Sequence, residues 1–224
     1  MIFYIGSSIL LYITYVSIDR YLPSNYIPES NEIVTRKYRI VNSVKSGFKM
    51  GLCVPGTQFI YNLLFYPELN QMAILNTIGV LYAASDLSAL LYNPRCHNST
   101  LFHHIIVQLF YYYCYLSNFN MYHGASRGIG IYCVISSYAF IVNFRLAIRC
   151  LPYKQFEFYI NEIALFIYIA ASVVNWITQI YLLCGGLNML LIERIIYALT
   201  LGTIMNDDLF LIKFLRKIDY KKRD

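Results

Sequence analysis

The sequence predicts an all-α fold, a polytopic membrane helical bundle with about seven transmembrane helices. Of its 224 residues, 58% are hydrophobic and only 13% are charged, whereas soluble domains carry about 25% charged residues. The aromatic residues include 23 Tyr and 14 Phe, side chains that tolerate both lipid and headgroups. With so few charged residues, the chain cannot cover its whole surface with groups suited to water.

Long apolar runs follow one another along the chain. A helix needs roughly 17 to 25 mostly apolar residues to cross the hydrocarbon core. Runs that meet this length lie at residues 2–18, 50–66, 69–92, 101–121, 128–144, 163–184 and 190–211. The first run lacks the basic start and the cleavage site of a signal peptide, so residues 1–25 are predicted to be a retained N-terminal transmembrane helix.

Basic residues lie on one side of these runs, and Lys and Arg in short loops remain cytoplasmic. They follow the first, third, fifth and seventh runs: Arg20, Arg36, Lys37, Arg39, Lys45, Arg95, Arg149, Lys154, Lys213, Arg216, Lys217, Lys221, Lys222 and Arg223. The alternate loops contain only Arg127. We therefore expect a cytosolic C-terminus and an N-terminus that is lumenal or outside. Because the basic residues form no single face, no nucleic-acid partner is expected.

Two short motifs are not expected to act as functional sites in a membrane protein of this orientation. Asn98, Ser99 and Thr100 form a glycosylation sequon, which is expected to stay unmodified because it falls in a cytosolic loop. Residues 124–130 resemble the glycine fingerprint of dinucleotide-binding dehydrogenases, which needs a preceding strand and a soluble βαβ unit. Here the glycines stand between two predicted membrane helices, so we expect a flexible lumenal turn.

Ionisable residues inside the runs are the candidate functional groups. Such a group costs at least about 2.5–3.5 kcal/mol at the bilayer centre, so it faces a partner or a cavity. Asp86, His103, His104, Arg145 and Asp207 all lie near cytosolic ends of predicted spans. A carboxylate beside an imidazole orients the ring for general acid or base work. Two plainer alternatives stay open: the histidines are interfacial residues without chemistry, and Arg145 snorkels to the headgroups.

Three short stretches carry a resemblance to a known family. They are residues 78–82 followed by Asp86 and Leu87, the pair His103 and His104, and residues 139–145, which read Ala-Phe-Ile-Val-Asn-Phe-Arg. In order and spacing they resemble the TLC domain of ceramide synthases and translocon-associated membrane proteins. The resemblance covers residues 36–217 and leaves 218–224 as a basic cytosolic tail.

The TLC resemblance implies a site and a choice of functions. His103 and His104 would be catalytic with Asp86, whereas Arg145, Asn143 and Asp207 would bind substrate. The enzyme would be an N-acyltransferase of the ceramide-synthase type, with acyl-CoA as co-substrate and neither a metal nor another cofactor. Ceramide synthases carry a further His-Asp-x-x-Asp stretch, but residues 128–144 contain neither His nor Asp. The chain therefore resembles more closely the non-synthase branch, which affects membrane lipid composition.

The C-terminal residues suggest a compartment. Lys221 and Lys222 stand fourth and third from the end and resemble a dilysine retrieval signal, which indicates the endoplasmic reticulum membrane. The alternative is a basic tail that only obeys the orientation rule. Taken together, these features favour a multi-pass protein of lipid homeostasis that binds membrane lipids or an acyl chain, with ceramide and other sphingolipids as candidate substrates. The other function left open is a non-catalytic lipid sensor, cargo receptor or translocon accessory protein.

Overall fold

The computed structural model of the chain describes residues 1–21, 32–65, 72–94, 98–116, 125–148, 154–186 and 189–220. Every element in these ranges is helical, which confirms the all-α prediction. The helices are α1 (Ile2–Tyr21), α2 (Glu32–Phe65), α3 (Met72–Tyr92), α4 (Asn98–Leu116), α5 (Ala125–Ser137), α6 (Phe140–Ile148), α7 (Lys154–Tyr181) and α8 (Leu191–Tyr220). A π-helical turn, η2 (Leu182–Gly186), follows α7.

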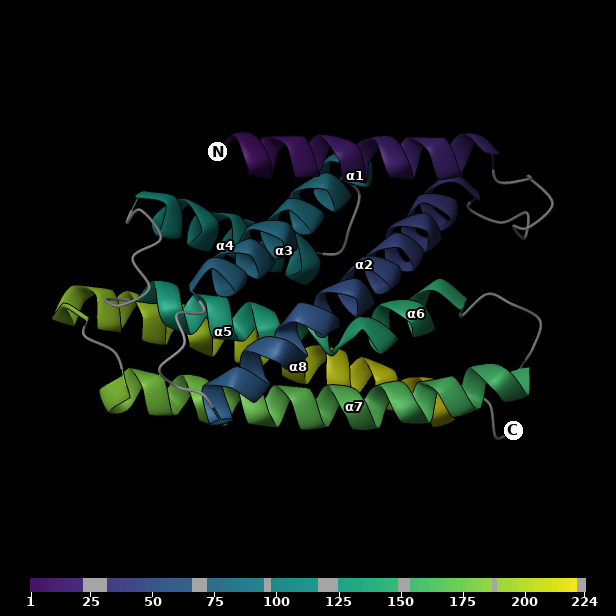
Figure 1. The fold of residues 1–224 in the computed structure, drawn as a ribbon. Helices are drawn as coiled ribbons and strands as arrows, with labels where there is room; N and C mark the ends of the chain where they lie inside the picture. Colours follow the sequence, from purple (N-terminus) through teal and green to yellow (C-terminus); the bar gives the residue numbers. More distant parts are fainter. Residues whose placement is uncertain are drawn as a thin grey trace.

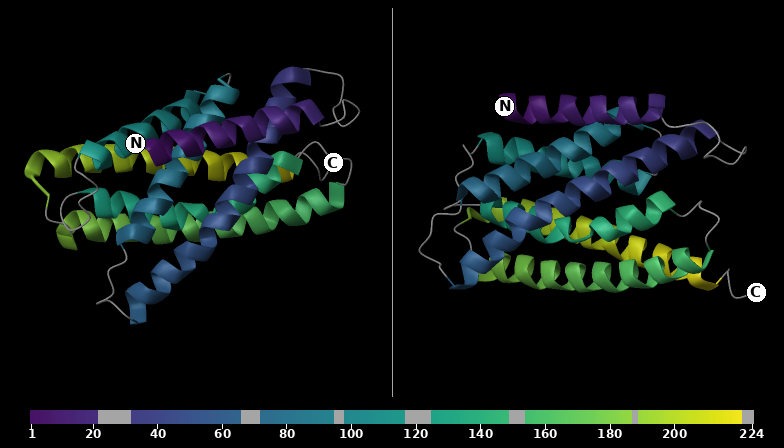
Figure 2. Two further views of the ribbon diagram at one scale, coloured as in Figure 1. Left: turned by 45° about the horizontal axis from the view of Figure 1, so that its top comes forward. Right: turned by 45° about the vertical axis from the view of Figure 1, so that its right-hand side comes forward.

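The helices run back and forth between two ends of an elongated bundle (Figure 1). The ends of α1, α6 and α8 lie together with the starts of α2 and α7, at the right in Figure 1, and the N-terminus lies toward the other end. Figure 2 shows the same arrangement from two further directions. Below, we call the end that holds the start of α2 the basic end, because Arg36, Lys37 and Arg39 lie there.

Four helices of the described chain are long and apolar enough to cross a membrane: α1, α3, α7 and α8. A fifth span results if the bent pair α5 and α6 counts as one. The chain is therefore a multi-pass membrane protein. Each predicted run overlaps a helix, but α2 and α4 are not apolar enough along their length to count as candidate spans. Lys49, Gln58 and Asn62 lower the hydropathy of the apolar part of α2, and histidines and tyrosines lower that of α4.

The predicted span 128–144 is not one straight helix. It is two helices, α5 and α6, which meet at an angle of 44°. At the break, the Tyr138 N–H donates to the Ile135 carbonyl (3.1 Å) and the Ala139 N–H to the Ser136 carbonyl (3.2 Å). These are i to i−3 bonds, which tighten the last turn of α5. Ser137 Oγ also donates to the Cys133 carbonyl (2.8 Å), and such back-bonding bends helices.

Helix α3 lies in the middle of the bundle and packs against α1, α2, α4 and α5. Its buried residues Leu75, Ile78 and Tyr82 belong to the largest hydrophobic cluster. Gly130 of α5 makes this packing possible, because a Cβ added there would lie 2.6 Å from Leu75 Cγ. The expectation of a flexible turn at residues 124–130 was therefore wrong: Ala125 to Gly130 form the start of α5 and are buried except for Arg127, and Gly124 is outside the described residues.

The basic segment after α1 is also different from the prediction. We expected Arg36 to Lys45 in a cytosolic loop, but α2 begins at Glu32, so this segment is helical. Asn42, Lys45, Ser46 and Lys49 are all buried. Their spacing of three and four residues places them on one face of the helix. This polar face, which points into the bundle, supplies one side of the candidate site.

Candidate functional site

Asp86 lies on α3 with its side chain fully buried, at 0% exposure. A carboxylate in such a place needs compensating charge or hydrogen bonds. Lys45 of α2, which is also buried, donates from Nζ to Asp86 Oδ1. The two residues form an ion pair that joins α2 to α3 at the centre of the bundle.

Both histidines predicted as catalytic lie beside this carboxylate. His104 of α4 has its Nδ1 3.4 Å from Asp86 Oδ1. His103 has its Nε2 4.0 Å from Asp86 Oδ2. The histidine pair therefore meets the acidic residue that sequence analysis assigned to the same site. Their catalytic role stays a prediction.

A second carboxylate approaches His103 from α8. Asp207 Oδ2 lies 3.4 Å from His103 Nδ1. The imidazole of His103 thus stands between two carboxylates, and it is 19% exposed where His104 is 9% exposed. We call Lys45, Asp86, His103, His104 and Asp207 the Asp86 cluster. It brings together residues of α2, α3, α4 and α8.

Several polar atoms of the Asp86 cluster have no hydrogen-bond partner among the described residues. These atoms are Asp86 Oδ2, His103 Nδ1 and His104 Nδ1, all of them buried. Buried polar atoms are nearly always satisfied, so exceptions call for a reason such as a catalytic role. At 3.4 and 4.0 Å, the histidine nitrogens lie beyond ordinary hydrogen-bond distance of the carboxylate oxygens.

The lysine one helical turn after Lys45 adds a second buried cation. Lys49 Nζ donates to the Tyr82 hydroxyl (3.3 Å) and lies 4.7 Å from the centre of the Tyr82 ring. Contact with an aromatic face stabilises a cation that has left water. Lys49 therefore extends the polar interior along α2, away from the start of the helix.

Arg145, predicted to bind substrate, belongs to a different polar group. Its side chain is 1% exposed, and Nη2 lies 3.0 Å from Glu157 Oε1. Its Nε donates to Asn161 Oδ1 (3.0 Å). Glu157 and Asn161 are both on α7, so the guanidinium ties α6 to α7. The structure thus does not bring Arg145 into the Asp86 cluster.

The other predicted residues lie as follows. Asn143 donates from Nδ2 to Asn42 Oδ1 (3.0 Å), which connects α6 with the polar face of α2. Asp208 faces away from its neighbour Asp207, since successive residues of an α-helix are about 100° apart. It accepts hydrogen bonds from the Tyr168 hydroxyl (2.6 Å) and from Trp176 Nε1 (2.9 Å), both on α7. Substrate binding by Asn143, Arg145 and Asp207 stays a prediction.

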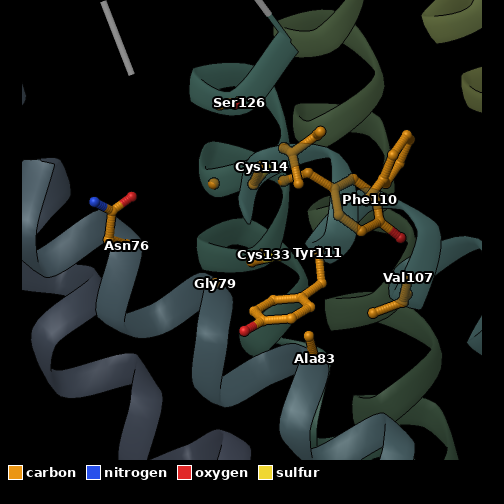
Figure 3. Close-up of a pocket in the computed structure, with 12 residues that line it drawn as sticks. Asn76, Gly79, Ala83, Val107, Phe110, Tyr111, Cys114, Ser126 and Cys133 are labelled. Atoms are coloured by element: carbon orange, nitrogen blue, oxygen red, sulfur yellow. The ribbon is translucent and has the colours of Figure 1, made fainter. Parts of the chain in front are cut away.

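A small cavity lies among α3, α4 and α5 (Figure 3). The side chains around it, such as Ala83, Val107, Phe110 and Cys133, are mostly apolar. Its volume is about 30 Å³, room for about one or two water molecules. It is too small for an acyl chain. The bundle interior described by the structure therefore offers a lipid no room at this position.

Three members of these groups, Lys45, Glu157 and Asn161, were not predicted from the sequence. Lys45 was assigned to a loop because hydropathy alone placed the helix start at residue 50. The signal that could have found it is the polar spacing of Asn42, Lys45, Ser46 and Lys49. No three histidine, cysteine or acidic side chains in the described ranges converge as metal ligands.

Comparison of the chain with known proteins finds no matching family model, no similar curated protein and no similar solved structure. The resemblance to the TLC domain therefore stays a prediction from the sequence.

Proposed function

We propose that this protein is a TLC-type membrane protein of the endoplasmic reticulum with about seven spans. In this proposal it acts in lipid homeostasis, and the Asp86 cluster transfers an acyl group from acyl-CoA to the amine or hydroxyl of a lipid. One observation carries the chemical part. His103 is partly exposed and stands between two carboxylates, 3.4 Å from Asp207 and 4.0 Å from Asp86.

In the proposed reaction His103 is the general base. Asp207 faces Nδ1 and orients the ring, which leaves Nε2 to take the proton from the lipid amine or hydroxyl. The deprotonated nucleophile attacks the thioester carbonyl, the carbon–sulfur bond breaks, and His103 gives its proton to the departing sulfur, so that coenzyme A leaves as the thiol. While the ring is protonated, Asp86 and Asp207 stabilise its positive charge.

A specific observation favours the non-catalytic alternative. Lys45 already compensates the charge of Asp86, so the Asp86 cluster can serve simply to hold α2, α3, α4 and α8 together. The absence of His and Asp from residues 128–144 points the same way. In that case the protein is a lipid sensor, cargo receptor or translocon accessory.

A double-mutant cycle on the cellular lipid profile separates these functions. We expect His103→Gln and Asp207→Asn each to lower the lipid product by about 100-fold, the usual minimum for losing a general base. The double variant should be little worse than either single one, because residues that act as a unit are strongly non-additive. Asp86→Asn should reproduce most of this loss.

Asp208→Asn is the matched control for the cycle. It removes the carboxylate next to Asp207 on α8. This carboxylate is buried and accepts hydrogen bonds from Tyr168 and Trp176, whereas Asp207 faces His103. The variant should leave the lipid product near the wild-type level at equal expression. Normal lipid profiles in the His103 and Asp207 variants, or losses that simply multiply, would favour the non-catalytic function.

The orientation is tested independently of any chemistry. In sealed microsomes a tag before Met1 should be protected from protease, whereas a tag after Asp224 should be digested, because the basic end is proposed to face the cytosol. Asn98, at the first residue of α4, should stay unglycosylated. Protection of both tags would mean an even number of spans and would contradict the proposal. Residues 221–224 lie outside the described residues, so dilysine retrieval stays a prediction.

A further inference from the structure

A large groove lies between α2 and α6 and reaches the end of α1 at Ile18. Its volume is about 690 Å³, within the range of about 300–1,000 Å³ that small-molecule sites have. Unlike the cavity of Figure 3, it has room for a hydrocarbon chain. None of the residues that line it belongs to the Asp86 cluster.

The lining of the groove changes in character along α2. Arg36 and Arg39 line it at the basic end, Ser43 and Ser46 follow, and Met50 lines it farther on. Across from them, α6 contributes apolar side chains, among them Phe140, Phe144 and Ile148. From Arg39 to Met50 the helix rises about 16 Å at 1.5 Å per residue. One leaflet of the hydrocarbon core is about 15 Å deep.

Both arginines are held at the mouth of the groove. Arg36 Nε donates to Asp19 Oδ1 at the end of α1 (2.6 Å), and Arg39 Nε donates to the Ala147 carbonyl at the end of α6 (3.2 Å). The bond to Ala147 fixes the position of the Arg39 guanidinium. The end of α1 and the start of α2 carry four basic residues, Arg20, Arg36, Lys37 and Arg39, and two acidic ones, Asp19 and Glu32. The planar donors of arginine suit phosphate oxygens in particular.

We propose that the groove between α2 and α6 binds an anionic phospholipid. The phosphate lies at Arg36 and Arg39, the glycerol ester region lies beside Ser43 and Ser46, and one acyl chain follows the apolar wall toward Met50. Basic pockets between membrane helices on the cytoplasmic side bind lipid headgroups in this way. The inference rests on the proposed function for the orientation of the basic end, but it does not require acyl transfer at His103.

Photolabelling of the purified full chain in nanodiscs tests this site. The discs contain phosphatidylcholine and a small fraction of phosphatidic acid with a photoreactive group on its acyl chain, and labelled peptides are mapped. We expect labelling of α2 and α6 along the groove. Arg36→Gln/Arg39→Gln should lower it by about tenfold or more, since each basic residue near anionic lipid contributes about fivefold. Arg216→Gln/Lys217→Gln, which changes two exposed residues at the end of α8, should change it less than twofold.

A second variant keeps the test independent of the arginines. Gly47 lines the groove, and a Cβ added there meets no atom within 4 Å, so Gly47→Trp fills the groove without a clash in the backbone. It should lower labelling of α6 by about tenfold, because the indole takes up the volume that the bound lipid would fill. Gly202→Trp is the control, because Gly202 on α8 has equally open surroundings and does not line the groove.

Three outcomes would overturn the proposal. They are labelling that Gly47→Trp leaves unchanged, equal labelling by photoreactive phosphatidylcholine and phosphatidic acid, and full competition by soluble glycerol phosphate, which would indicate a site for the free phosphate. His103→Gln should label like the wild type. Normal labelling of a chain that has no effect on cellular lipids would therefore refute the proposed acyl transfer and leave the phospholipid site intact.

Discussion

Lys45→Met is expected to lower the free energy of unfolding by about 3–5 kcal/mol, the usual cost of removing one partner of a buried ion pair. Lys45 and Asp86 are both buried, and the lysine donates to a carboxylate oxygen at the centre of the bundle. Without the lysine, that carboxylate either keeps an uncompensated charge away from water or takes up a proton. Both alternatives cost free energy relative to the native pair.

Unfolding of the purified protein in detergent measures this effect. Asp86→Asn in the Lys45→Met background should recover more than half of the loss, because it removes the charge that the first substitution exposed. Lys213→Met changes an exposed lysine of α8 and should stay within about 0.5 kcal/mol of the wild type. If Lys45→Met is no more destabilising than this control, then the Asp86 carboxylate does not depend on the lysine.

The positions of the helices could be predicted because the bilayer makes the rule simple. A run long and apolar enough to cross hydrocarbon has to be helical, since lipid offers its backbone no hydrogen bonds. For this reason each predicted run overlaps at least one of the helices. The break between α5 and α6 depends instead on local bonds, such as that from Ser137 to the Cys133 carbonyl. Hydropathy does not detect such bonds.

The candidate site was predictable only in part. The cost of a buried charge singled out Asp86 and the histidines, and the structure brings these residues together. That same cost applies to Lys45, but a hydropathy window treats a lysine near the start of a helix as the end of the membrane span. Its partner lies 41 positions along the chain. Only the packing of α2 on α3 makes the contact.

Arg145 is a second residue whose partners could not be predicted from the sequence, and replacing it is expected to have a large effect on stability. Sequence analysis predicted substrate binding for this residue, whereas in the structure the guanidinium makes a buried ion pair with Glu157 and a hydrogen bond to Asn161. We therefore expect Arg145→Met to destabilise the protein by about 3–5 kcal/mol, because it leaves Glu157 buried beside an apolar side chain. Arg145→Lys should recover only part of this loss, since an ammonium cannot reproduce the fork of donors.

A double variant that removes both charges separates a structural role of Arg145 from a role in binding substrate. Arg145→Met/Glu157→Leu replaces the ion pair by two apolar side chains of similar size, a change that is often neutral in buried positions. If Arg145 acts through α7 alone, this double variant should regain most of the unfolding free energy and also the wild-type lipid profile. If Arg145 binds a phosphate or carboxylate, the double variant should be stable but should still alter the lipids. Unfolding in detergent and lipid analysis of the same three variants distinguish these results, because only a binding role separates stability from the lipid change.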